Sequence, residues 1–150
     1  MNAVRIETLD WADDALVRQA RALIVAAFDD GGRYGEERMA AEICQQGSSF
    51  YRQFFVAQRE GRLLGVAGVK GADWASDTHI LYLSAVAKEF RNQGIGRALV
   101  EARLDWLLAN NSRGRILVST VKPRRFKKLG FRAIDGSRQE GRWLMMRLIR

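Results

Sequence analysis

Apolar and polar positions recur with two different periods along the chain, and these periods predict long helices and short strands. Residues 13–28 and 95–110 place apolar side chains three and four positions apart, which is typical of a helix with one buried face. On the second helix, the positions expected to face the core are Ile95, Leu99, Ala102, Trp106 and Ala109. The predicted strands are residues 4–8, 54–58, 63–69, 78–86, 115–121, 131–134 and 143–149.

Shorter helices and turns complete the pattern. Residues 36–46 and 123–129 predict two short helices, each followed by a glycine that can end it. Glu60-Gly61 predicts a tight hairpin turn between two strands. Gly65 and Gly68 lie inside the second of these strands, where glycine indicates a close approach of other atoms to the backbone.

The predicted order of elements is βααβββαβαββ, which belongs to the α/β (α+β) class. The strand–helix–strand step over residues 78–121 implies two parallel strands joined by a right-handed crossover, and the hairpins on either side imply antiparallel pairing. We therefore expect a mixed, mostly antiparallel central sheet flanked by helices. Pro123 is the only proline and no linker-like stretch is present, so residues 1–150 are expected to form a single domain.

Composition excludes several classes of protein. With 150 residues, 47% hydrophobic and 28% charged, the chain resembles an ordinary globular domain and not a disordered one. Cys44 is the only cysteine, which excludes an internal disulfide framework and a multi-cysteine zinc site, and no metal is expected. The start of the chain lacks the features of a signal peptide, and no apolar run is long enough to span a membrane. We expect a cytoplasmic protein without a membrane partner.

Charge is distributed unevenly along the chain. The formal net charge is +8, but residues 1–75 carry 9 basic and 11 acidic side chains, whereas residues 76–150 carry 16 and 6. A basic half can meet nucleic acid, an anionic membrane or a small polyanion, or it can be an ordinary solvated surface. A site shaped to hold an anion within this half would distinguish these possibilities.

Such a site is predicted where the strand of residues 78–86 leads into the helix of residues 95–110. The run Arg91-Asn92-Gln93-Gly94-Ile95-Gly96 precedes the helix, whose first backbone N–H groups lack partners and carry partial positive charge. Glycines let a phosphate approach the main chain, and Arg91 and Arg97 add charged donors. The run lacks a Walker lysine and the third glycine of a dinucleotide fingerprint, and by itself it could be an ordinary glycine-rich loop.

Two stretches resemble a known family. The stretch VAKEFRNQGIGRAL, which begins at Val86, resembles the acetyl-CoA signature of the GNAT superfamily, the acetyl-CoA-dependent N-acyltransferases. The stretch FKKLGF, which begins at Phe126, resembles the family's Tyr-x-Lys-x-Gly-Phe segment. The hairpin of residues 54–69 resembles the two strands before the signature. The resemblance covers nearly the whole chain in order and implies a GNAT-like fold.

The resemblance also implies an activity and a set of binding residues. It implies an N-acetyltransferase that moves an acetyl group from acetyl-CoA to an amine by direct attack. The strand of residues 83–86 would part from residues 117–120 to admit pantetheine, and Ser84 and Val86 would bind pantetheine and orient the thioester through their main chains. The residues expected at the pyrophosphate and elsewhere on the cosubstrate are Arg91, Asn92, Gln93, Gly94, Ile95, Gly96, Arg97 and Phe126.

The catalytic groups depart from the family pattern. Phe126 stands where many members carry a tyrosine that is thought to protonate the leaving thiolate, and phenylalanine cannot donate a proton. Where the family often carries a Glu or His base, this chain has Ile80 and Tyr82. Tyr82 can orient a water, line the acceptor pocket or simply pack in the core. His79, the only histidine, has the opposite strand parity and is expected to face away from Tyr82.

The acceptor side is left open by the sequence. Acidic side chains that could attract a cationic amine are Asp29, Asp30, Glu36 and Glu37. Basic side chains that could instead hold a carboxylate are Arg33, Arg138 and Arg142. Aromatic side chains that could pack against an acceptor are Tyr34 and Tyr51. Solvated loop charges are the simpler explanation of the charged groups.

Other functions remain as alternatives. A non-catalytic acyl-CoA-binding regulatory module on the same fold would also fit Phe126 and the missing base. The basic side chains Lys122, Arg124, Arg125, Lys127 and Lys128 could form a solvated helix face, contact the ribose phosphate of CoA or bind nucleic acid. No aromatic residue interleaves with them as a stacking platform would require, so a nucleic-acid partner is not expected. A homodimer that pairs through the last strands stays open.

Overall fold

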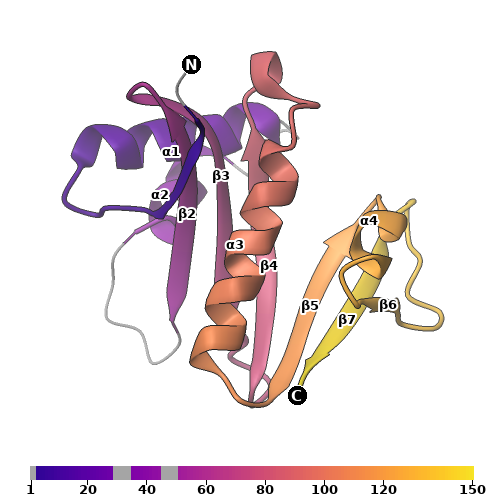
Figure 1. The fold of residues 1–150 in the computed structure, drawn as a ribbon. Helices are drawn as coiled ribbons and strands as arrows, with labels where there is room; N and C mark the ends of the chain where they lie inside the picture. The colour runs from indigo at the N-terminus through magenta and orange to yellow at the C-terminus, as the bar shows by residue number, and fades with distance from the viewer. Residues whose placement is uncertain (1–2, 29–34, 45–50) are drawn as a thin grey trace.

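The computed structural model describes residues 3–28, 35–44 and 51–150, and in them a β-sheet carries helices on both faces (Figure 1). The strands are β1 (Arg5–Thr8), β2 (Arg52–Arg59), β3 (Arg62–Gly71), β4 (Thr78–Val86), β5 (Gly114–Thr120), β6 (Arg132–Ala133) and β7 (Trp143–Ile149). The helices are α1 (Asp14–Ala27), α2 (Glu36–Glu42), α3 (Ile95–Asn110) and α4 (Pro123–Lys127), and a short 3₁₀ turn, η1 (Lys88–Phe90), precedes α3. The predicted order of elements is confirmed.

Seven strands form one sheet in the order β1-β2-β3-β4-β5-β7-β6. All neighbouring pairs are antiparallel except β4 and β5, which run parallel. Parallel neighbours need a crossover connection, and α3 supplies it. The predicted mixed, mostly antiparallel sheet and its one parallel step are therefore confirmed.

β4 and β5 stay together for only part of their length. Their pairing ends where Leu81 lies opposite Val118. Beyond that point β4 remains paired with β3 as far as Val86, and β5 remains paired with β7 as far as Thr120. The sheet thus divides into two parts that diverge toward the top of Figure 1, as the resemblance implied for this region.

A β-bulge in β4 accompanies this divergence. The register against β3 shifts so that Tyr82 faces Gly68 while Ala85 faces Val66. Leu83 lies inside the bulge with a φ of +48°, in the left-handed region that residues with side chains rarely adopt. Because a bulge bends the strand that carries it, this one can turn the end of β4 away from β5.

The helices divide between the two faces of the sheet. α1 and α2 cover one face, and α3 and α4 lie on the other (Figure 1). α1 starts where the carboxylate of Asp13 accepts a hydrogen bond of 3.0 Å from the backbone N–H of Leu16. Among the helices within the described ranges, none is both long enough and apolar enough to cross a membrane.

The buried face of α3 differs from the predicted one. Ile95 and Leu99 are buried as expected, but Ala102 and Trp106 are only half-buried and Ala109 is exposed. The other buried side chains of α3 are Val100, Arg103, Leu104 and Leu107. The buried face of α3 therefore includes Arg103, which a prediction from apolar positions alone leaves out.

Two other predicted helices are shorter in the structure. α2 ends at Glu42, and residues 45–47, where the end of this helix was predicted, lie outside the described residues. α4 ends at Lys127 and not at residue 129, because the chain turns there to bring the N–H of Phe131 to the carbonyl of Phe126 at 3.0 Å.

Gly68 allows two aromatic rings to meet over β3. A Cβ atom at this position would lie 2.6 Å from Phe54 Cε1 and 2.8 Å from Tyr82 Cε1. The centroids of these two rings are 5.7 Å apart, and Phe54 is fully buried. Gly65 is also crowded, with Leu99 Cδ1 at 3.0 Å from its Cβ position, so the predicted close approach holds at both glycines.

We expect Gly68→Ala to lower the free energy of unfolding by about 1–3 kcal/mol, because the added methyl group would overlap the rings of Phe54 and Tyr82. Denaturant unfolding followed by circular dichroism measures this change. Gly96→Ala is the matched control, since its Cβ would meet nothing closer than 3.7 Å and alanine favours helix. Equal stability of Gly68→Ala and the wild type would contradict the packing described.

Candidate functional site

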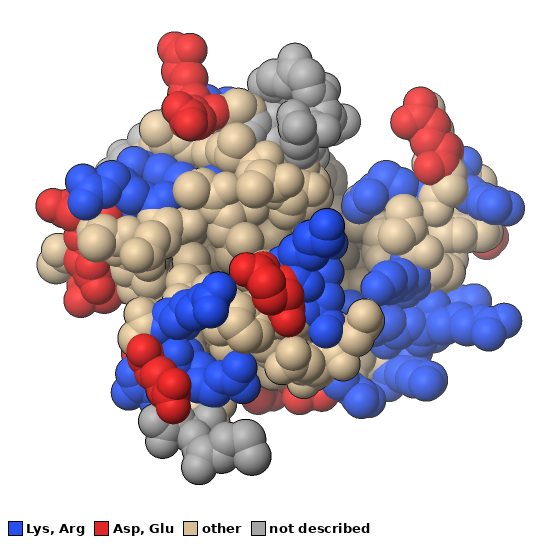
Figure 2. Space-filling view, turned by 90° about the horizontal axis from the view of Figure 1, so that it is seen from above, with Lys and Arg blue, Asp and Glu red and all other residues tan. Residues whose placement is uncertain are grey.

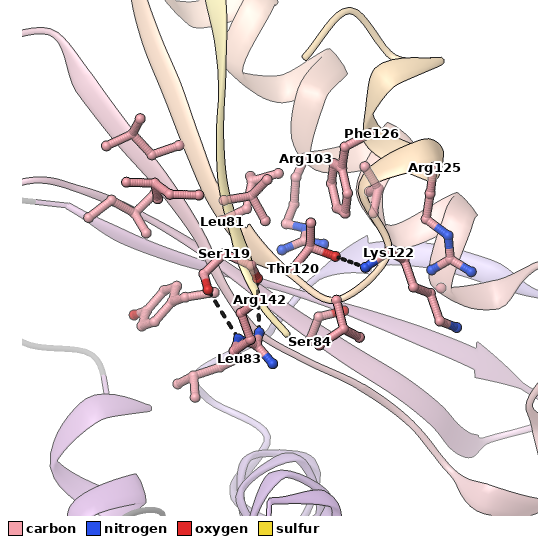
Figure 3. Close-up of a pocket in the computed structure, with 18 of the residues that line it drawn as sticks. Leu81, Leu83, Ser84, Arg103, Ser119, Thr120, Lys122, Arg125, Phe126 and Arg142 are labelled. Carbon is pink, nitrogen blue, oxygen red and sulfur yellow. Dashed lines mark hydrogen bonds between the residues drawn. The ribbon is translucent and has the colours of Figure 1, made fainter. Parts of the chain in front are cut away.

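A cavity of roughly 500 Å³ fills the gap where β4 and β5 diverge. The residues lining it from these strands are Ile80, Leu81, Tyr82, Leu83, Ser84, Leu117, Val118, Ser119 and Thr120. From the α3 face it is lined by Arg103 and Phe126 (Figure 3), together with Gly96 and Val100. Phe28, at the end of α1, lines it from the other face. The cavity therefore passes through the plane of the sheet and can be approached from both faces.

A second hollow of roughly 420 Å³ adjoins the first at the start of α3. The two share Ser84, Gly96, Lys122 and Arg125 among their lining residues, so they form one continuous groove. Of the predicted pyrophosphate residues and their neighbour Arg97, those that line this hollow are Arg91, Asn92, Gly94, Ile95, Gly96 and Arg97. Gln93 is exposed and lines neither hollow.

The backbone shapes this end of the groove. Asn92 and Gly94 have φ values of +65° and +83°, which turn the chain sharply into α3. No side chain caps α3, and its first turn contains no acidic residue. A Cβ atom at Gly94 would meet no atom within 4 Å, so the space in front of the helix is open. Unpaired N–H groups at an open helix start are suited to bind a phosphate.

Basic side chains surround the same opening. Arg91, Arg97, Lys122 and Arg125 line it, and Arg125 Nη1 lies 3.7 Å from the Cβ position of Gly96. Figure 2, seen from above, shows Lys and Arg gathered around the recess between the two parts of the molecule. Of the basic run of α4, only Lys122 and Arg125 line the groove. This location favours contact with a small polyanion.

The diverging end of β4 presents main-chain groups to the groove. Ala87 N–H bonds to Leu64 O on β3 at 2.8 Å. Successive N–H groups of a strand point to opposite edges, so the N–H of Val86 is directed to the open edge. Its carbonyl oxygen accepts a hydrogen bond of 3.0 Å from Arg91 Nε. Ser84 is exposed and lines both hollows.

Tyr82 lies at the α1 side of the cavity. Its ring packs beside Phe54, and Lys70 Nζ lies 4.5 Å from the ring centroid. Its hydroxyl oxygen is buried and has no hydrogen-bond partner among the described residues. Burial raises the pKa of Tyr82, and the nearby carboxylate of Glu42 raises it further, so the phenol is neutral at physiological pH. Tyr82 thus both packs in the core and lines the cavity.

No pattern in the sequence places Glu42 near Tyr82. Glu42 Oε1 lies 3.4 Å from Lys70 Nζ and 3.7 Å from Arg52 Nε. Burial by itself would raise the pKa of Glu42, but the Tyr82 hydroxyl and these two cations outweigh burial and lower it. An ionised carboxylate is therefore held behind Tyr82. Only the folded sheet brings these residues together, since α2, β2, β3 and β4 each supply one.

His79 and Tyr51 lie away from the cavity. His79 faces α3, opposite to Tyr82 as predicted, and its Nδ1 is 2.5 Å from the hydroxyl of Tyr51. Tyr51 packs its ring on His79 and Trp106 at centroid distances of 5.7 and 5.3 Å. Burial lowers the pKa of His79. Neither residue lines the cavity, so the structure does not bring them to the predicted acceptor site.

The remaining predicted site residues fall into three groups. Phe126 lines the cavity and packs edge-on against Phe131 at 5.3 Å between centroids. Arg142 also lines it, held by hydrogen bonds to Ser119 Oγ at 3.1 Å and Ser119 O at 3.0 Å (Figure 3). Those lying elsewhere are Arg138, over the ring of Trp143, and the exposed Glu36 and Glu37. Those outside the described residues are Asp29, Asp30, Arg33 and Tyr34.

Comparison with known proteins identifies this arrangement. Residues 11–131 match the model of the acetyltransferase (GNAT) family. The chain is 31% identical over 126 residues to an uncharacterized N-acetyltransferase of Chlorobaculum tepidum, which covers 83% of this chain and 79% of that protein.

Solved structures share the fold. An acyl-CoA N-acyltransferase from Pseudomonas aeruginosa superposes with a TM-score of 0.77 and 16% identity, over 97% of this chain and 99% of that one. The PaiA N-acetyltransferase of Thermoplasma acidophilum, solved in complex with coenzyme A, superposes with a TM-score of 0.69 and 17% sequence identity, over 97% of this chain and 98% of that one. The family match and the curated relative together show that this chain belongs to the GNAT family and is an acyl-CoA-dependent acetyltransferase.

Proposed function

We propose that the protein transfers an acetyl group from acetyl-CoA to an amine by direct attack within the gap between β4 and β5. The observation that carries the proposal is the end of pairing at Leu81 and Val118 beside the uncapped start of α3. These two features place an anion-binding helix terminus and a cavity through the sheet in one continuous groove. An elongated molecule with phosphates at one end and an acyl group at the other fits this groove.

The phosphate end is held by the main chain between residues 91 and 96. The left-handed backbone at Asn92 and Gly94 aims N–H groups outward, and Gly96 leaves no side chain in front of them. Arg97 and Arg125 supply positive charge without blocking the opening. Arg91 is also tied to Val86 O, so it links the phosphate loop to the end of β4.

The thioester end is oriented by the exposed edge of β4. When bound, acetyl-CoA supplies an activated acetyl group. The N–H groups of Ser84 and Val86 pair with pantetheine and with the thioester region because β5 no longer occupies that edge. A backbone N–H aimed at the carbonyl oxygen stabilises the negative charge that builds there during attack, by an amount on the order of 3 kcal/mol.

The acceptor enters from the α1 side, where Tyr82 and Phe28 line the cavity. The amine nitrogen bonds to the thioester carbonyl carbon while the carbon–sulfur bond breaks, and CoA leaves as a thiolate with that electron pair. Tyr82, neutral at physiological pH, positions the water that takes the proton from the amine. Phe126 donates no proton, so the thiolate is protonated by water. Positioning of the two reactants then supplies most of the acceleration.

We expect Gly96→Glu to weaken acetyl-CoA binding at least tenfold, because a carboxylate would stand where the phosphates approach α3. Gly96 is chosen over Gly94 because its φ is not positive and its Cβ position is uncrowded, so the fold is kept. Isothermal titration with acetyl-CoA measures the affinity. Gly96→Gln, which matches the size without the charge, should bind more tightly than Gly96→Glu. Unchanged affinity in both variants would remove the phosphate site from this loop.

We expect Tyr82→Phe to lower kcat about tenfold and to change the pH–rate profile, because the hydroxyl that positions the water is gone. Protein stability should change by less than about 1 kcal/mol, because the buried hydroxyl makes no hydrogen bond of ordinary geometry and the neighbouring Glu42 keeps Lys70 and Arg52 beside it. Steady-state kinetics from pH 6 to 9 and thermal unfolding measure the two effects. If the pH–rate profile and kcat are both unaltered, Tyr82 only packs in the core and does not position the water.

A further inference from the structure

Arg103 is a buried cation inside the groove. It is 1% exposed and has the largest of the fully buried side chains described, yet it also lines the cavity between β4 and β5. No Asp or Glu within the described residues lies within ion-pair distance of it. Burying a charge without a counter-ion costs several kcal/mol, so such a group is normally paired with an anion.

Hydrogen bonds to the backbone use only two of the three guanidinium nitrogens of Arg103. Nε donates to Leu99 O at 3.1 Å and Nη1 donates to Gly68 O at 2.9 Å. These bonds hold the guanidinium group in one orientation beside the bulge of β4. Neither of these two bonds uses Nη2. A structural role explains the contacts of Arg103 with Leu99 and Gly68. It does not explain why a charged side chain without a carboxylate partner is buried here.

The position of the guanidinium group is at the narrow end of the gap. Gly68, which accepts its hydrogen bond, lies opposite Tyr82, one residue beyond the last paired position of β4 at Leu81. Figure 3 shows Arg103 turned toward the gap, in view between Leu81 and Phe126. The phosphate loop lies at the other end of the same helix face, at Gly96. A molecule bound along the groove therefore places its acyl end toward Arg103.

The surroundings of Arg103 are apolar. The other residues that line the cavity next to it are Leu81, Val100, Leu117, Val118 and Phe126. A short hydrocarbon chain fits such walls, whereas the buried guanidinium group of Arg103 calls for one anionic group on that chain. The other basic residues that line the cavity are exposed: Lys122, Arg125 and Arg142. Burial lowers the pKa of Arg103 to about 9, so it remains a cation at neutral pH. A carboxylate would supply the missing counter-ion and accept the free N–H donors.

We propose that Arg103 binds the terminal carboxylate of a dicarboxylic acyl group, so that the enzyme takes acyl-CoA donors such as succinyl-CoA in preference to uncharged donors of the same length. The proposal rests on the donor placement of the proposed function. The bonds that form and break are the same as in the transfer of an acetyl group. The amine forms an amide bond to the thioester carbonyl carbon, the carbon–sulfur bond breaks and sulfur keeps its electrons. The amine proton goes to water, and the distal carboxylate is unchanged in the product.

The wild-type protein alone gives the first test. Isothermal titration compares succinyl-CoA with butyryl-CoA, whose acyl chain has the same length and no charge. We expect succinyl-CoA to bind at least tenfold more tightly, as a charge-assisted hydrogen bond in a buried site provides. Equal affinity, or tighter binding of butyryl-CoA, overturns the proposal. The measurement needs no acceptor amine.

Variants locate the effect. Arg103→Met should remove the preference for succinyl-CoA over butyryl-CoA, whatever its effect on overall affinity. Arg97→Met is the matched control on the same helix, since Arg97 lies at the phosphate end and should weaken both thioesters equally. If Arg103→Met does not fold, Arg103→Lys should reduce the preference without abolishing it. A preference that persists in folded Arg103→Met, or that is undiminished in Arg103→Lys, overturns the assignment.

Two results separate this proposal from the proposed function. If acetyl-CoA binds with an affinity that Gly96→Glu weakens while succinyl-CoA shows no advantage, the donor site stands and the role of Arg103 is wrong. If neither acetyl-CoA nor succinyl-CoA binds to the wild type, the donor site itself is wrong and this proposal fails with it.

Discussion

The parallel pairing of β4 with β5 ends after Leu81 and Val118, and the functional geometry follows from that one interruption. Each strand keeps its antiparallel partner, so the two parts of the sheet remain stable while they diverge. The bulge at Leu83 stores backbone strain at this point, and the hydrogen bond from Arg103 to Gly68 O braces it. Because the gap crosses the sheet, the proposed donor and acceptor can approach from opposite faces without displacing each other.

Much of this architecture could be predicted from the sequence because the signals are local. The limits of β4 and α3 agree with the predicted residues 78–86 and 95–110, since β4 is a largely apolar run and α3 ends at Asn110, shortly before Gly114. The Glu60-Gly61 turn has the positive φ values that a tight hairpin requires. The sequence also predicts the open turn before α3, because glycines and arginines before a strong helix are visible in one short stretch; phosphate binding there stays a prediction.

The rest depends on contacts between distant segments. Arg103 was missed because a charged residue on a helix reads as solvent-exposed, although it follows Ile95 and Leu99 at intervals of four. Glu42 and Tyr82 come from α2 and β4, and no spacing in the chain predicts their meeting. The positive φ of Leu83 has no sequence signal either, because leucine does not favour that conformation. The alternation of side chains along β4 correctly predicts that His79 and Tyr82 face opposite sides of the sheet. The contact between His79 and Tyr51 depends on the folded sheet.

The groove uses different chemistry at its two ends, and this has a consequence for how related enzymes can diverge. The proposed phosphate end is built from main-chain N–H groups and left-handed turns, so on this proposal most side chains of that loop can change without altering what it recognises. The inner end is built from side chains: Arg103, Val100, Val118 and Phe126. A change of donor therefore requires only a few substitutions at this end. The acyl group that is transferred can therefore change during evolution while the CoA part of the donor stays the same.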